Sequence, residues 1–192
     1  GQQVEAYAGP HHQRASRLRF ERAPQLRRAV DHVSQALVLS RRTGRMASEA
    51  VQLGNRGNMW LLLGHLTEAA ADGKAALQLY RKSGNRGGEA VVLSGLGIVG
   101  FYRGEYATAM EDSEQSLRIS LEVGDRYGEA IALEAIALIH MAGTRADLAL
   151  PLAEEAVRLA RETGDQLTEA YALTVVGQAM RAAGDGPGAA DR

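Results

Sequence analysis

Cysteine is absent from this 192-residue sequence. Its absence excludes a disulfide framework and any thiolate metal site, and it fits a reducing compartment, so we expect a cytoplasmic location. No apolar run approaches the roughly 18 residues that span a bilayer, and the first residues contain no signal-peptide core, so no membrane contact is expected. Aromatic residues make up only 5% of the chain and prolines number four. Ala, Leu, Arg and Glu dominate instead, a composition that favours helix.

A net charge of one sign is also lacking, because 22 Lys and Arg stand against 23 Asp and Glu. This balance excludes a general attraction to nucleic acid or anionic lipid. The distribution is uneven: residues 1–42 hold eight Arg and three acids, net +5, and residues 43–192 hold 14 basic and 20 acidic residues, net −6. The early arginines form either a basic face or an ordinary solvated helix surface, and the second interpretation is the simpler one. They are Arg14, Arg17, Arg19, Arg22, Arg27 and Arg28.

No arrangement of residues indicates catalysis or a cofactor site. The sequence has no Walker loop, no GxGxxG following a strand and no HExxH. His32, His65 and His140 have no partner at metal-ligand spacing. Adjacent carboxylates such as Glu154 and Glu155 diverge on a helix and do not form an acid–base pair. We therefore expect no enzymatic activity, no cofactor and no metal.

The sequence does contain a 40-residue period that needs no gap. The recurring columns are Gly at 44, 84, 124 and 164; Glu-Ala at 49–50, 89–90, 129–130 and 169–170; Leu at 53, 93, 133 and 173; a small residue at 57, 97, 137 and 177; a turn residue at 64, 104, 144 and 184; Ala at 69, 109, 149 and 189; and a small residue before an apolar one at 76–77, 116–117 and 156–157. Such a period predicts a stack of identical structural units.

Each unit is predicted to be an antiparallel helix pair. Ala50, Leu53 and Gly57 are three and four residues apart, which places them on one face of a helix. Ala69 and Ala76 supply matching small residues on a second helix, so that the two helices can approach closely. A pair this small cannot bury its apolar face alone, and stacking of neighbouring pairs buries it.

The helix ends are marked by glycine and by capping residues. The Gly columns are predicted to take the left-handed conformation that ends a helix. Asn85, Asp125 and Asp165 follow these glycines and are predicted to cap the next helix. The recurring Glu lies in the first turn, where a carboxylate interacts favourably with the helix dipole.

This pattern predicts helix pairs at 45–63 with 66–83, 86–103 with 106–123, and 126–142 with 146–163, followed by a first-type helix at 166–183. Residues 25–42 keep the second-helix pattern through Ala29, Ala36 and Leu37. Residues 11–22 are interpreted as a degenerate helix and 1–10 as flexible. The predicted domains are an N-terminal segment, 1–24, and a solenoid, 25–192. The solenoid divides into a preceding second helix (25–43), full units (44–83, 84–123, 124–163) and a partial unit (164–192). Because the pattern enters and leaves out of phase, we expect part of a longer protein.

These columns resemble the tetratricopeptide repeat (TPR). The matching residues are Leu53, Gly57, Gly64, Ala69 and Ala76, then Leu93, Gly97, Gly104, Ala109 and Ser116, then Leu133, Ala137, Ala149 and Ala156. The TPR unit is usually 34 residues long, and this unit has 40. The longer unit, with GDRYGEA from Gly124 and GNRGGEA from Gly84, is similar to repeats of kinesin light chains, spindle-orientation adaptors and bacterial peptide-sensing regulators.

Its Arg, Ala and Gly content most resembles the C-terminal repeat region of actinobacterial transcription regulators, of the signal-transduction ATPase, antibiotic-regulatory and LuxR-like types. The resemblance implies an all-α fold, a right-handed α-solenoid of antiparallel helix pairs (the TPR superhelix). Two departures stand out. Arg56 occupies a column held by apolar residues in the other units, which predicts weaker packing or a side chain that extends out of the stack, and Thr144 replaces a turn glycine.

The resemblance also implies a concave groove lined by the first helices. In such a groove, Asn amides can pair with a peptide backbone, and apolar neighbours supply pockets for its side chains. Phe101, Tyr102, Leu138 and Met141 have packing against the next repeat as an alternative. The candidate groove residues are Val51, Asn55, Asn58, Leu62, Val91, Ser94, Ile98, Phe101, Tyr102, Ile131, Glu134, Leu138, Met141, Tyr171, Thr174, Gln178 and Arg181.

The leading hypothesis from the sequence is a scaffold that binds a protein or peptide, as the sensory or interaction segment of a larger bacterial transcription regulator. One alternative is a self-association module, such as a homodimer, that sets the oligomeric state. A second alternative is nucleic-acid contact through the Arg-rich N-terminus, which the overall charge balance disfavours.

Overall fold

A computed structural model describes the backbone of residues 10–184 and the side chains of residues 23–183. Within that range the chain consists of helices joined by short turns, as predicted: α2 (Pro10–Arg42), α3 (Met46–Leu63), α4 (Leu66–Ser83), α5 (Arg86–Arg103), α6 (Tyr106–Val123), α7 (Arg126–Ala142), α8 (Ala146–Thr163) and α9 (Gln166–Gly184). From α3 onward these bounds agree with the predicted ones to within one residue. The expectations for residues 1–9 and 185–192 lie outside the described residues.

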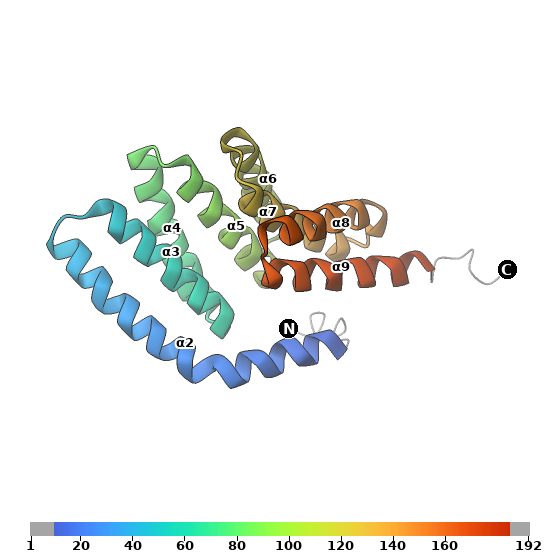
Figure 1. The fold of residues 1–192 in the computed structure, drawn as a ribbon, viewed down its shortest axis with the longest axis horizontal. Helices are drawn as coiled ribbons and strands as arrows, with labels where there is room; N and C mark the ends of the chain where they lie inside the picture. The colour runs from blue at the N-terminus through green and yellow to red at the C-terminus, as the bar shows by residue number, and fades with distance from the viewer. Residues whose placement is uncertain (1–9, 185–192) are drawn as a thin grey trace.

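The helices form one continuous stack in which each pairs with the next (Figure 1). The predicted pairs α3–α4, α5–α6 and α7–α8 are present, and α9 packs on α8. Besides these contacts, α3 touches α5, α5 touches α7 and α7 touches α9. The first helices of successive units therefore lie side by side in one layer. This arrangement is the helical repeat that the 40-residue period predicts.

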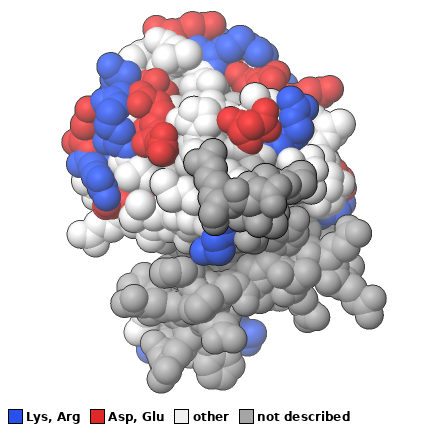
Figure 2. All heavy atoms as spheres, turned by 90° about the vertical axis from the view of Figure 1, so that its right-hand side faces the viewer, with Lys and Arg blue, Asp and Glu red and all other residues white. Residues whose placement is uncertain are grey.

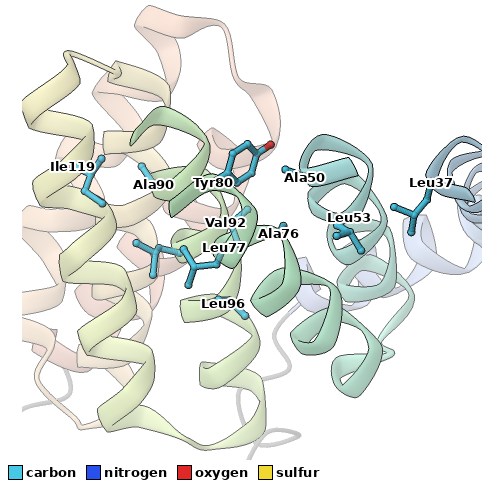
Figure 3. Packing of buried hydrophobic residues seen from close by; sticks show 11 residues of the cluster. Leu37, Ala50, Leu53, Ala76, Leu77, Tyr80, Ala90, Val92, Leu96 and Ile119 are labelled. Atoms are coloured by element: carbon cyan, nitrogen blue, oxygen red, sulfur yellow. The ribbon is translucent and has the colours of Figure 1, made fainter. Parts of the chain in front are cut away.

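The small and apolar columns form the core between these helices. Ala50, Leu53 and Gly57 of α3 are buried, and so are Ala69 and Ala76 of α4. The second and third units bury their equivalents as well. Figure 3 shows how one cluster joins successive helices, from Leu37 and Leu53 through Tyr80 to Ile119. Because each unit contributes to a cluster shared with its neighbour, the units are stable only as a stack.

Glycine is required where the second helix comes closest to the first. A Cβ atom added at Gly97 would lie 2.2 Å from the Ser113 hydroxyl oxygen and 3.2 Å from the Ala109 carbonyl oxygen. A Cβ added at Gly57 would lie 3.3 Å from the Ala69 carbonyl oxygen. The predicted role of this small-residue column, close helix approach, is thus confirmed for these two units.

The turn glycines also behave as predicted, with positive φ at all six positions described: Gly44, Gly64, Gly84, Gly104, Gly124 and Gly164. The third unit differs, because Thr144 takes the left-handed conformation there with φ of 58°. Of the predicted N-caps, the Asn85 side chain accepts a bond from the Gly88 N–H, and Asp165 accepts bonds from Leu167 and Thr168. The prediction for Asp125 is wrong, since its side chain makes no capping bond.

Thr144→Gly is expected to stabilise the protein by about 0.5–1 kcal/mol. A β-branched residue at positive φ carries a backbone cost of roughly 1–2 kcal/mol, and the greater freedom of glycine in the unfolded chain offsets part of the gain. Chemical denaturation measures the change. Thr67→Gly, inside α4, is the matched control and should destabilise instead. Equal destabilisation by both substitutions would contradict this account of the turn.

The N-terminal part differs from the expected map. Instead of a degenerate helix at 11–22 and a second helix from 25, residues 10–42 form the single helix α2, with Pro24 inside it. Proline lacks an N–H and crowds the carbonyl one turn earlier, so it bends a helix without always ending it. Figure 1 shows α2 bending along its length. Residues 11–22 therefore do not fold back against residues 25–42.

Two sets of ion pairs within the stack were not predicted. The recurring Glu accepts a bond from an Arg of the preceding helix at three junctions, Arg41–Glu49 (2.8 Å), Arg81–Glu89 (2.9 Å) and Arg161–Glu169 (2.7 Å). The Arg column at 41, 81 and 161 is the sequence signal that would have revealed them. The other pair explains Arg56, whose guanidinium bonds both oxygens of Asp72 in its own unit and does not extend out of the stack.

Candidate functional site: the first-helix face

All the predicted groove residues belong to α3, α5, α7 and α9, whose outer surface is here called the first-helix face. Its clearest feature is a column of apolar side chains 40 residues apart: Val51, Val91, Ile131 and Tyr171. Val51 and Val91 are 44% and 46% exposed, while Ile131 and Tyr171 are half-buried. The column thus crosses four adjacent helices, and the stack does not bury it.

Two amides flank this column on α3. Asn55 and Asn58 are both exposed, and neither side chain makes a hydrogen bond to another described residue. Each amide therefore has a donor and an acceptor available to a ligand. The structure places these two predicted residues at the surface, as a role in binding would require.

Other predicted groove residues are partly packed against neighbouring helices and partly exposed at the surface. Ile98 and Tyr102 pack against the buried cluster of Leu61 and Val99, and Phe101 contacts the ring of Tyr106 on α6. Leu138 packs in the cluster around Ala137 and Val175, and Leu62, like these, is half-buried. These residues support the helices and leave part of their surface open, so the alternative of packing against a neighbouring repeat holds for much of each side chain.

Three predicted residues are buried and do not line the surface. Ser94 is 1% exposed and shares a 2.6 Å hydrogen bond with Ser116 of α6. Met141 lies in the core between α7 and its neighbours. Glu134 is 4% exposed, and burial raises the pKa of its carboxyl to about 8, with a further contribution from the negative charge of Asp165. The prediction that these three face a groove is therefore wrong, and for Met141 the alternative, packing against the next repeat, holds.

The reason lies in how the first helices are turned. Ser94 and Glu134 share a column with Gly54, and a Cβ atom at Gly54 would lie 3.6 Å from Val92 of the next first helix. This column therefore faces the neighbouring helix and not solvent. On α9, the remaining predicted residues keep more contact with solvent: Thr174 donates to the Ala170 carbonyl, Gln178 is half-buried and Arg181 is exposed.

The described residues also bear on metal binding, membrane insertion and a basic surface. No group of three His, Asp or Glu side chains among them is placed to hold a metal ion. Within the same part of the chain, no helix is long and apolar enough to cross a membrane. Of the Arg-rich N-terminus, Arg27 and Arg28 are exposed on α2, and the side chains of the other four arginines lie outside the described residues.

Comparisons with known proteins agree with this architecture. Two crystal structures of a putative kinesin light chain from Podosopora anserina, with nearly identical TPR-like repeats, are similar to this chain with TM-scores of 0.63 and 0.62. The sequence identities are 17% and 16%, and each match covers 91% of this chain and 85% of the other. No protein-family model and no curated protein matches the sequence. The similarity therefore concerns the fold: this chain is an all-α helical repeat of the TPR-like kind.

Proposed function

We propose that the first-helix face binds an extended segment of a partner protein. The observation that carries the proposal is the apolar column Val51, Val91, Ile131 and Tyr171, which the stack leaves partly uncovered. Apolar side chains lined up across adjacent helices, with unpaired amides beside them, provide the pockets and backbone contacts that peptide recognition uses.

The spacing of the column suggests the form of the bound segment. Packed helices are about 8–10 Å apart, and an extended chain rises about 3.1–3.3 Å per residue. Neighbouring positions of the column are therefore about three residues apart along a bound segment. A polyproline II conformation, with about three residues per turn, would turn every third side chain toward the column. The proposed ligand is a segment of about ten residues with an apolar side chain at every third position.

The charge of the face supports an uncharged ligand core. Among the first-helix residues near the column, Arg56 is already paired with Asp72. Glu134 is buried, and at neutral pH its raised pKa keeps it protonated. Asn55 and Asn58 are neutral. Affinity in this proposal therefore comes from apolar burial and amide bonds, and it should depend weakly on salt concentration.

The proposal also concerns the kind of protein in which this repeat acts. The resemblance of the repeats to those of actinobacterial regulators suggests that the bound segment serves as a signal to a transcription regulator. Under that proposal, a longer chain would join this repeat to a DNA-binding or nucleotide-binding segment, and its response would require the first-helix face. Loss of the apolar column should then remove regulation and leave DNA binding intact.

Substitution of the column tests the proposal on a defined probe. A peptide-display library selected on the unmodified protein provides ligands whose affinity is then measured by fluorescence anisotropy. Val51→Asp with Val91→Asp should weaken binding on the order of tenfold or more, because each places a charge where apolar contact is expected. Asn55→Ala with Asn58→Ala should weaken binding of the same peptides and leave the helicity and the melting temperature of the protein unchanged.

The matched control is Val123→Asp on α6, since Val123 is 47% exposed, nearly as much as Val91, and lies on a second helix. It should leave binding unchanged. Selected peptides that bind all three variants equally well would contradict the proposal, and equal loss of folding in the asparagine variant would make those residues structural.

A further inference from the structure

Helix α9 carries the first-helix pattern, but no described segment covers the face that receives a second helix elsewhere. Ala170 is exposed and Leu173 is 44% exposed, whereas their equivalents in the three full units are buried. A Cβ atom added at Gly177 would meet only the tip of the Arg181 side chain, at 3.7 Å. At Gly57 and Gly97, the second helix fills this space.

Helix α2 has the complementary deficiency. Its residues 25–42 carry the second-helix pattern, yet Ala29 and Ala36 are only half-buried, whereas the equivalent alanines and serine of α4, α6 and α8 are buried. Leu37, which faces α3, is fully buried. The open side of α2 is therefore the side that meets a first helix in the full units. Because residues 10–42 form one helix, residues 11–22 do not fold back to cover it.

We propose that these two faces bind each other between two copies of this chain, with α2 of one copy packed on α9 of the next. Within each full unit the same two patterns already form the helix pair, so the stack itself shows that their shapes fit. The new pair would place Ala29 against Gly177, as Ala69 lies against Gly57. The contact is head-to-tail and extends the array without any new type of interface.

Net charge is divided unevenly along the chain. Residues 1–42, which include α2, carry a net charge of +5, and the rest of the chain carries −6. Figure 2 views the end of the array that carries α8 and α9. Charged side chains of both signs gather there toward the upper rim. The first-helix face stays free, so this proposal and peptide binding can fail independently.

The test uses sedimentation velocity on the protein and two variants, each blocked at one end. The unmodified protein should show a mass that rises with concentration. Leu173→Glu and Ala29→Glu should each weaken association on the order of tenfold or more, because each buries an unpaired carboxylate in an apolar contact. An equimolar mixture of the two variants should form a one-to-one complex, since each retains the end that the other has lost.

Several outcomes would overturn the proposal. A monomer at every concentration would show that the two ends do not bind each other. Association retained by Ala29→Glu but lost by Leu173→Glu would indicate a symmetric α9 contact instead. Leu121→Glu, at a leucine of α6 that is 57% exposed and outside both faces, is the control and should associate normally. Circular dichroism of each variant checks that the helices are intact.

Discussion

Arg56→Ala should destabilise the protein by about 3 kcal/mol, because it leaves the Asp72 carboxylate buried without its partner. The Arg56 guanidinium donates to Asp72 through Nε at 2.6 Å and Nη2 at 2.7 Å, and through Nη1 to the Ser34 hydroxyl at 3.1 Å. The pair therefore joins α3 to α4 and α2. Asp72 is 8% exposed, so water cannot replace the lost donors.

The third unit supplies a control for this prediction. At the positions equivalent to Arg56 and Asp72 it has Ile136 and Leu152, both of which pack in the apolar core. The double variant Arg56→Ile with Asp72→Leu should therefore recover most of the stability, since a well-packed apolar pair often equals a buried ion pair. Urea denaturation measures both variants. A double variant as unstable as Arg56→Ala would mean that loss of the ion pair itself, and not the unpaired Asp72 carboxylate, sets the cost.

The second large effect is expected at Glu134. Burial, together with the nearby Asp165 charge, raises the pKa of this carboxyl to about 8 in the folded protein. The folded state therefore holds a proton that the unfolded chain releases near pH 4.5. This contribution to stability is fully present below pH 4.5, declines as pH rises, and is lost once the pH passes about 8.

Glu134→Gln should remove this pH dependence and raise the free energy of unfolding at pH 8 by about 2–4 kcal/mol relative to the unmodified protein, since one pKa unit corresponds to about 1.4 kcal/mol. Glutamine has nearly the shape of the protonated acid and cannot ionise. Denaturant unfolding from pH 4 to 8 measures the difference between the two proteins. Glu154→Gln, at an exposed position on α8, is the control and should leave the curve unchanged. Parallel curves for Glu134→Gln and the unmodified protein would contradict the account.

Much of the fold could be predicted because the same physical problem recurs three times. Gly84 and Gly124, for example, end equivalent helices with the same left-handed backbone. The role of each column could therefore be predicted from several equivalent positions. Ala, Leu and Gly three and four residues apart share one helix face, and this pattern predicts close packing of that face against a second helix. Even where Thr144 replaces glycine, the turn keeps its left-handed backbone.

Features that occur once were not predicted from the period. The sequence predicted separate helices at 11–22 and 25–42, because no other unit showed how that segment folds, but residues 10–42 form one helix. The pairing of Arg56 with Asp72 could not be predicted, because the period does not show that these two side chains meet in space. Glu134 was assigned to the groove by the geometry that the TPR resemblance implies, and only the packing of α7 against its neighbours shows that this carboxyl is buried.

Hydrogen–deuterium exchange, with a peptide selected on the unmodified protein, tests the central claim most directly. If the first-helix face is the binding surface, bound peptide should slow exchange in α3, α5 and α7, around Val51, Val91 and Ile131, and leave α4, α6 and α8 unchanged. Slower exchange confined to the second helices, or spread evenly over the stack, would contradict the account.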